Sequence, residues 1–214
     1  MREITRMTDT TSTRADAQRR RVLAASVEIF GRQGYRATSM NEIAAGVGLS
    51  KPTLYHYFRN KEELLVRIYS DVLDESLRMA RETIDAAATP FDGLRDLLVF
   101  RVVYTCENRE LLKICFEEED ELGPDLAEEL LVRRRAFEDL FTATLEQHLA
   151  GHPDLHLAMT PKVFVNMCLG AVNWTYKWYR PSGPRTPAEL GREMADALLA
   201  VITPESGTGA SAPA

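Results

Sequence analysis

Hydroxyl, phenol and ammonium groups gather in one short stretch near the amino end of the chain. These groups belong to Ser50, Lys51, Thr53, Tyr55, His56, Tyr57 and Lys61. Leu54 and Phe58 lie four residues apart, so on a helix both face the core and leave the polar groups outside. Ser50 can cap this helix, and Pro52 suits its first turn, where a missing N–H is no loss. A polar rod of this kind fits the major groove of DNA, and its side chains also suit phosphate oxygens.

A second short helix is predicted immediately before this stretch, from about Met40 to Val47. Ser39 and Glu42 mark its start, because they have the spacing of a capping box. Gly46 and Gly48 flank its end, where a glycine takes the left-handed conformation without steric cost. The two helices and their tight turn have the pattern of a helix-turn-helix, although a solvated helical hairpin without DNA contacts has the same pattern.

The stretch resembles the DNA-binding domain of TetR-type transcriptional regulators. The resemblance covers about residues 18 to 66 and is carried by IFGRQGYRATSM (residues 29 to 40), NEIAAGVGLS and KPTLYHYFRNKEELL. It implies caps against phosphate, side chains near base edges, contacts with the DNA backbone and a lysine that pairs with phosphate. In that order, the implied residues are Thr38 and Ser39; Lys51, Pro52 and Thr53; Tyr55, His56 and Tyr57; and Lys61. Ser50, as the helix cap, completes the predicted DNA-binding set.

The charge of the chain is distributed unevenly. Residues 1 to 61 carry eleven Lys and Arg against five Asp and Glu, whereas residues 62 to 214 carry fifteen against twenty-seven. A basic N-terminal module on an acidic body fits DNA binding by the N-terminal part alone. The sequence has no run of 18 apolar residues and no apolar signal region, so we expect a cytoplasmic protein without a membrane partner.

Helical periodicity continues along the rest of the chain, so the expected fold class is all-α with about nine helices. An N-terminal three-helix DNA-binding domain is expected over residues 14–60, and a C-terminal helical ligand-binding and dimerisation domain over residues 61–203. Residues 1–13 are predicted to be a disordered arm and residues 204–214 a disordered tail. The later predicted helices cover residues 61–88, 91–107, 109–117, 125–150, 161–179 and 187–201.

A second segment of interest, NWTYKWYRP at residues 173 to 181, carries four aromatic side chains within six residues. Asn173, Trp174, Lys177 and Trp178 share one face of the predicted helix, because they lie three and four residues apart. That face is predicted either to pack against a second subunit or to line a pocket in which Asn173 and Lys177 are polar anchors. The predicted ligand-binding set is Phe100, Arg101, Tyr104, Met167, Asn173, Trp174, Lys177 and Trp178.

Residues 173 to 190 look like the C-terminal helices of a TetR subgroup that includes regulators of fatty-acid and sterol breakdown. Those regulators respond to acyl-CoA thioesters. The resemblance implies an apolar pocket for the acyl part, with cations near its mouth for the CoA phosphates. The candidate cations, each of which could equally be a surface charge, are Arg101, Arg109, Lys113, Lys177 and Arg180.

The three cysteines and one acidic run have weaker chemical interpretations. Cys106, Cys115 and Cys168 lie in apolar helical contexts, so we expect reduced thiols packed as small hydrophobes, with a redox switch as the alternative. The acidic run at residues 117–121 is predicted to be a solvated turn. A divalent-cation site is the alternative, but adjacent carboxylates converge poorly on one ion.

His148, His152 and His156 recur every four residues, the spacing at which an unbroken helix could hold zinc. Gly151 and Pro153 interrupt that helix. We therefore predict no metal site, and no cofactor is expected elsewhere in the chain.

These features predict a ligand-responsive transcriptional repressor that binds a palindromic double-stranded DNA operator as a homodimer. A small apolar effector, with an acyl-CoA thioester as the candidate, would release it by favouring a head spacing that misfits the DNA. One alternative is a helical acyl-CoA-acting enzyme, but the sequence has no convincing nucleophile–base set, phosphate loop or nucleophile elbow. The other alternative is a DNA-binding protein without a small-molecule ligand.

Overall fold

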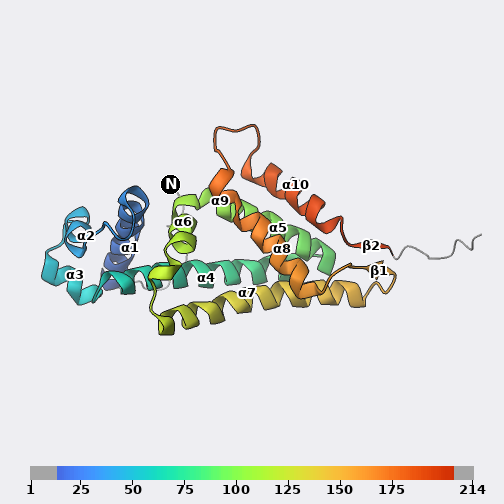
Figure 1. The fold of residues 1–214 in the computed structure, drawn as a ribbon, viewed down its shortest axis with the longest axis horizontal. Coiled ribbons are helices and arrows are strands. Elements are labelled where there is room, and N and C mark those ends of the chain that lie inside the picture. The colour runs from blue at the N-terminus through green and yellow to red at the C-terminus, as the bar shows by residue number, and fades with distance from the viewer. Residues whose placement is uncertain (1–13, 205–214) are drawn as a thin grey trace, which may run out of the picture.

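A small helical head occupies one end of an elongated molecule, and a larger helical body occupies the rest (Figure 1). The computed structural model describes residues 14–204, except for the side chains of Asp120 and Asp125. The predicted arm, residues 1–13, and residues 205–214 of the predicted tail lie outside the described residues. The head consists of α1 (Arg14–Gln33), α2 (Met40–Gly46) and α3 (Lys51–Tyr57).

The body is helical except for one short strand pair within the described residues. Its helices are α4 (Lys61–Ala86), α5 (Pro90–Glu107), α6 (Arg109–Glu117), the 3-10 turn η1 (Glu119–Glu121), α7 (Pro124–Ala150), α8 (Pro161–Asn173), α9 (Thr175–Trp178) and α10 (Pro187–Leu199). Helix α4 leaves the head and runs beside α7 along the body, and α5 packs against α10 (Figure 1). This architecture confirms the predicted all-α class, with a head of three helices and a helical C-terminal body.

Local sequence signals set the starts of the long helices. The Asn60 side chain accepts a hydrogen bond from the Glu63 amide at 2.7 Å and begins α4. Thr186 begins α10 with a capping box, because its hydroxyl accepts from the Glu189 amide at 3.3 Å and its own amide donates to the Glu189 carboxylate at 2.8 Å. Such caps satisfy backbone donors that have no partner inside the helix.

The predicted helix over residues 161–179 is divided at Trp174 into α8 and α9. The buried Thr175 hydroxyl donates to the Val172 carbonyl at 2.7 Å, a bond of the kind that bends helices. The predicted common face is therefore wrong for Asn173, which is half-buried and bonds inward, whereas Trp174, Lys177 and Trp178 are all exposed.

The buried apolar side chains form two clusters, and one of them joins the head to the body. That first cluster includes Ile43 and Leu54 of the head together with Leu64 of α4 and Leu112 of α6. The second cluster lies wholly in the body, where α5, α7, α8 and α10 contribute to it. The hydrophobic core thus continues past residue 60, so the head packs as one unit with the start of α4.

A two-residue strand pair closes the far end of the body. Strand β1 (Leu155–His156) pairs antiparallel with β2 (Thr203–Pro204), and Leu155 lies opposite Pro204. Pro204, where the predicted tail begins, is therefore paired with the α7–α8 connection. Over residues 14–204, no helix combines the length and apolar character that a membrane crossing requires.

Candidate DNA interface and effector-binding region

The two short helices of the head are held in place by caps that the sequence predicted. The Ser39 hydroxyl accepts from the Glu42 amide at 3.3 Å, and the Glu42 carboxylate accepts from the Ser39 amide at 2.7 Å. Hydrogen bonds from the Ser39 side chain and amide lower the pKa of Glu42 below its usual value. Gly48 has a φ of 69° and turns the chain, after which Ser50 accepts from the Thr53 amide at 3.3 Å.

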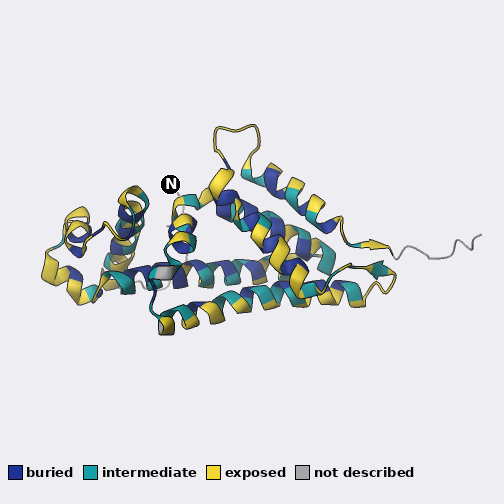
Figure 2. Cartoon of the chain, viewed as in Figure 1, coloured by how far each residue is buried: buried dark blue, intermediate teal, exposed yellow. Residues whose placement is uncertain are grey.

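Helix α3 buries one face in the head and exposes the other (Figure 2). Leu54 is fully buried and Phe58 is nearly so, which confirms the predicted core side. Tyr57 is half-buried beside the same core. The exposed residues of the helix are Lys51, Pro52, Thr53, Tyr55 and His56. Tyr55 is 42% exposed, so its phenol is available to a partner outside the protein.

Thr38 and Lys61 from the predicted DNA-binding set bond inward to the protein backbone. The Thr38 side chain is buried and donates to the Gly34 carbonyl at 2.8 Å. The half-buried Lys61 ammonium donates to the carbonyls of Tyr35 at 2.6 Å, Arg36 at 3.3 Å and Thr38 at 2.9 Å. It also lies 4.2 Å from the centre of the Tyr35 ring. Lys61 therefore ties the start of α4 to the loop between α1 and α2.

The acidic run at residues 117–121 connects the body to the head, which corrects the prediction of a solvated turn. Glu118 accepts from the Tyr35 amide at 3.4 Å, and Glu121 accepts from the Arg36 Nε at 2.6 Å. Both partners lie more than 80 residues away, in the loop of the head that Lys61 also holds. We call these two contacts the head bracket.

The other described carboxylates of the run bind the body. Glu119 pairs with Arg134 of α7 at 2.8 Å and accepts from the Tyr69 hydroxyl at 3.3 Å. Glu117, at the end of α6, forms an ion pair with Lys177 of α9. The run is therefore bonded to the head, to α7 and to α9 at once.

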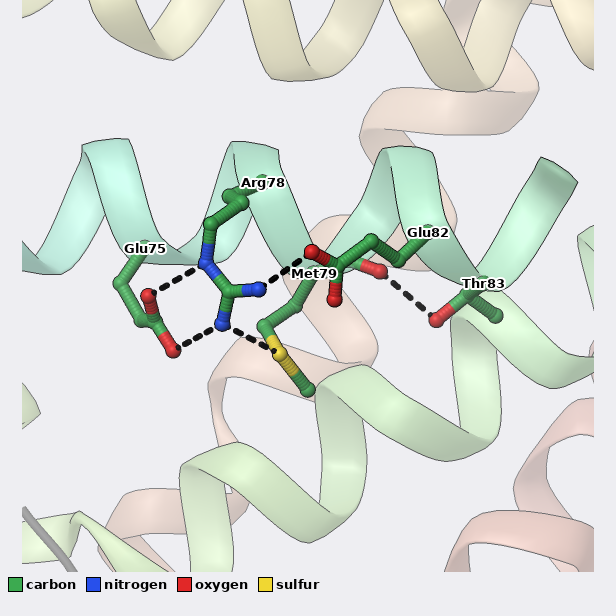
Figure 3. A network of polar contacts seen from close by, with 5 residues as sticks. All are labelled: Glu75, Arg78, Met79, Glu82 and Thr83. Atoms are coloured by element: carbon green, nitrogen blue, oxygen red, sulfur yellow. Dashed lines mark hydrogen bonds and ion pairs between the residues drawn. The ribbon is translucent and has the colours of Figure 1, made fainter. Parts of the chain in front are cut away.

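The middle of α4 carries a network of side chains centred on Arg78 (Figure 3). The Arg78 guanidinium donates to both carboxylate oxygens of Glu75, at 3.0 and 2.8 Å, and pairs with Glu82 one turn later. The hydrogen bonds that Arg78 donates to Glu75 raise the pKa of Arg78. Pairs at these spacings stabilise a helix, so they support α4 as a continuous rod between head and body.

The predicted ligand-binding residues fall into two groups, of which the first lies inside the body. Arg101 of α5 is buried, and its Nε donates to the Asn173 side-chain oxygen at 2.8 Å. Tyr104 and Phe100 are half-buried on the same helix, with ring centres 5.8 Å apart. The Arg101 guanidinium carbon lies 5.5 Å from the centre of the Phe137 ring on α7. These residues bring together a cation, an amide and three aromatic rings.

The second group lies on the outer surface. Met167 is 41% exposed, Trp174 57% and Trp178 47%, and Val163 on α8 is 54% exposed. Lys177 is also exposed and is held by Glu117. Val163, Met167 and Trp174 lie four and seven residues apart, so they follow one side of α8 to its end. We call these three residues the α8 stripe.

The thiols are all buried, as the sequence led us to expect. Cys106, Cys115 and Cys168 are each free and at most 5% exposed. Burial raises the pKa of both Cys115 and Cys168 to about 12, so the thiolate needed for oxidation is scarce.

The histidine repeat shows no metal geometry among the residues described. The His148 and His152 rings have centres 4.6 Å apart, but His152 bonds the His148 carbonyl and His156 lies in β1. No three potential ligand side chains converge within residues 14–204.

Two parts of the chain match known families. Residues 22–68 match the family described as bacterial regulatory proteins, tetR family. Residues 87–202, more than half of the chain, match the tetracyclin repressor-like C-terminal domain.

Individual relatives match most of the chain. The HTH-type transcriptional repressor KstR2 of Mycobacterium tuberculosis is 25% identical over 203 residues, which are 92% of this chain and 98% of the relative. Among solved structures, the TetR family transcriptional regulator PfmR from Thermus thermophilus has a TM-score of 0.76 at 27% identity, covering 84% of this chain and 97% of that one. AibR, solved in complex with isovaleryl coenzyme A and operator DNA, has a TM-score of 0.74 at 25% identity, covering 88% and 100%.

Proposed function

The chain belongs to the TetR family of bacterial regulatory proteins, and we propose that it is a ligand-responsive transcriptional repressor that binds a palindromic operator as a homodimer. Members of this family are transcriptional regulators and not enzymes, so the acyl-CoA-acting enzyme considered from the sequence is set aside. Repression is proposed because the KstR2 relative is named as a repressor.

The observation that carries the proposal is the outward polar face of α3. This face stands over a buried Leu54, so the side chains are presented by a rigid helix and not by a loop. We assign base-edge contacts to Lys51, Pro52 and Thr53 at the start of the helix, and phosphate contacts to Tyr55 and His56. Ser39, Ser50 and Tyr57 remain proposed neighbours of the DNA. Thr38 and Lys61 act by shaping the loop behind them.

Dimerisation is proposed through the α8 stripe. Exposed apolar side chains in a row cost free energy in water, and covering them with a second copy recovers it. Trp174 at 57% exposed is the largest member and suits an interface anchor. A twofold pair of bodies would hold two heads at a fixed distance, as two half-sites of a palindrome require.

The proposed effector site is the inner group of Phe100, Arg101, Tyr104 and Asn173. AibR was solved with isovaleryl coenzyme A, which makes an acyl-CoA thioester the candidate effector here. For tenfold release, the effector must bind the released state about 1.4 kcal/mol better than the operator-fitting state.

We propose that the effector signal leaves this site through α9 and α6. Asn173 ends α8 directly before α9, Lys177 of α9 pairs with Glu117 of α6, and the head bracket follows just after Glu117. A shift of α9 would displace the α1–α2 loop of the head through these contacts, and α4 would transmit the resulting tilt of the head. Residues 14–60 would act as the DNA-binding domain and residues 61–203 as the ligand-binding and dimerisation domain.

The DNA-binding role is tested by selecting bound duplexes from a random-sequence pool and measuring their affinity by electrophoretic shift. We expect an inverted repeat to be enriched. Thr53→Ala and Tyr55→Ala should each weaken binding at least tenfold, whereas Arg192→Ala on the exposed side of α10 should bind like the wild type. No enriched duplex, or wild-type affinity in both head variants, would refute the proposal.

The sensor role is tested separately by thermal shift with isovaleryl-CoA and longer acyl-CoA thioesters. A ligand that binds only the folded state must raise the melting temperature. A protein that binds its operator but is neither stabilised nor released by any compound would be a DNA-binding protein without a small-molecule effector.

A further inference from the structure

The guanidinium of Arg101 is a buried cation in the centre of the body. The residue is 7% exposed and lies among α4, α5, α7 and α8. Its Nε donates to Asn173 at 2.8 Å, and its Nη1 donates to the Ser76 hydroxyl at 3.1 Å. Its carbon lies 5.5 and 5.8 Å from the ring centres of Phe137 and Tyr104.

All of these neighbours are neutral. No carboxylate among the described side chains lies within ion-pair distance of Arg101. Burial raises the pKa of Tyr104 and of nearby Cys115 to about 12, so neither supplies a negative charge at neutral pH. Arg134 shows the contrast, because that arginine of the same body pairs with Glu119 at 2.8 Å.

A buried charge without a counter-charge is costly, and proteins normally pair it. A guanidinium has five N–H donors in a planar fork that matches a carboxylate. Only two of its contacts in the described structure are hydrogen bonds to side-chain oxygens, and both oxygens are uncharged. An anionic oxygen in the position of the Asn173 amide oxygen would form a stronger bond, because the acceptor would then also be charged.

A second buried donor without a partner lies one helical turn further along α5. The Thr105 hydroxyl is fully buried and has no hydrogen-bond partner among the described residues. Residues four apart on a helix share a face, so α5 carries two incompletely satisfied polar groups into the same interior.

We propose that Arg101 is the anchor for a negatively charged end of the effector, and that the effector is an apolar molecule whose buried end carries a carboxylate. This deepens the proposed sensor function and rests on it. Asn173 holds the acceptor position in the structure and, in this proposal, yields it to the carboxylate. Because Asn173 ends α8 next to the break at Trp174, its release frees α9, which leads through Lys177 to the head bracket.

Binding of a carboxylate by the buried Arg101 differs from binding of CoA phosphates by cations at a pocket mouth. A carboxylate can reach Arg101 either as a free acid or as the far end of a longer conjugate. The experiment therefore uses straight-chain carboxylates of increasing length, each beside its primary amide, and also the CoA monothioesters of the matching dicarboxylic acids, which keep one free carboxylate at the far end. The amide has nearly the same shape as the acid and no charge.

Binding is measured by thermal shift and calorimetry on the purified full chain. We expect at least one acid to stabilise the wild type, its amide to bind at least tenfold more weakly, and Arg101→Gln to lose the response. Arg95→Gln is the matched control, because Arg95 lies on the same helix but is paired with Asp196 at the surface. It should respond like the wild type.

Asn173→Asp provides a second variant, which does not remove the cation. It places a carboxylate beside Arg101 within the chain, so we expect a higher melting temperature without ligand and no further response to the acid. The proposal is overturned if no acid of the series stabilises the wild type, if amides match acids, or if Arg101→Gln keeps the response. Operator binding by the wild type, measured in parallel, distinguishes these outcomes from failure of the DNA-binding role.

Discussion

Replacing Lys61 by Met separates a structural role from a DNA-contacting one. The structure gives this ammonium three carbonyl acceptors at 2.6 to 3.3 Å and a ring at 4.2 Å. Met keeps much of the apolar stem and removes every one of these contacts. We therefore expect the head to lose stability even when no DNA is present.

The magnitude follows from the contacts. Hydrogen bonds to a charged group contribute roughly 1.5–3 kcal/mol each, and a cation over a ring adds roughly 0.5–1 kcal/mol. Lys61 is half-buried, so water replaces part of what is lost, and the three acceptors share one donor group. We expect Lys61→Met to lower the free energy of unfolding by about 3 kcal/mol. For a chain of this size, that corresponds to about 6–12 °C in melting temperature.

The assay is urea unfolding and thermal melting of wild type and variant without DNA. Lys51→Met is the matched control, since Lys51 is exposed on α3 and should change the free energy of unfolding by less than about 0.5 kcal/mol. Lys51→Met should instead weaken operator binding and relax the sequence preference, because Lys51 is assigned to base edges. Unchanged stability in Lys61→Met, combined with a lower salt slope, would show that Lys61 contacts phosphate and that our assignment is wrong.

Three further outcomes are expected. The pKa of Glu42 is lowered in the folded state, so its carboxylate stabilises the protein above about pH 4.3 and the contribution is lost on acidification. The melting temperature of Glu42→Gln should therefore be lower than that of the wild type at pH 7 and equal to it at acid pH. A difference in melting temperature that does not change with pH would contradict this. Gly191→Ala places a methyl group 3.1 Å from the Val99 carbonyl oxygen where α10 packs on α5. Urea unfolding should therefore show a free energy of unfolding lower by about 1–3 kcal/mol. An unchanged unfolding midpoint would mean that the two helices separate easily. Trp174→Glu should shift the protein from dimer to monomer in sedimentation velocity, whereas Val132→Glu at an exposed valine of α7 should not; a stable Trp174→Glu dimer would exclude the α8 stripe as the interface.

The sequence was informative wherever structure depends on neighbouring residues. The capping box of Ser39 and Glu42, the turn at Gly48 and the cap at Ser50 each involve groups within four residues, and all were predicted correctly. The inward face of α3 followed from the spacing of Leu54 and Phe58 alone. These local rules were sufficient to predict the head and the outward residues of α3.

Features that depend on distant partners were not predictable in the same way. The three carbonyl acceptors of Lys61 lie 23 to 26 residues earlier in the chain, so local spacing does not reveal them. From the sequence, Lys61 was therefore assigned to phosphate. The acidic run looked solvated because its partners Tyr35 and Arg36 lie more than 80 residues away. The neutral surroundings of Arg101 come from four helices, and no periodicity reveals that a counter-charge is missing there.

The split of the aromatic segment had a signal that was too weak to use. A buried threonine that bonds back to its own helix can bend it, but Thr175 resembles any exposed helical threonine until its burial is known. That bend separates Asn173 from Trp174, so one predicted face became an inner contact and an outer surface. The two predicted roles of the segment, pocket and interface, are therefore compatible.

The inaccessibility of the three thiols has a practical consequence for spectroscopy. Cys106, Cys115 and Cys168 should not react with maleimide or nitroxide reagents under native conditions. A single cysteine introduced at exposed Asn41 of α2 would then carry the only label on each subunit, without a cysteine-free background. In the proposed dimer, distances between two such probes, measured by pulsed electron resonance, would report how far apart the two heads stand before and after a compound binds.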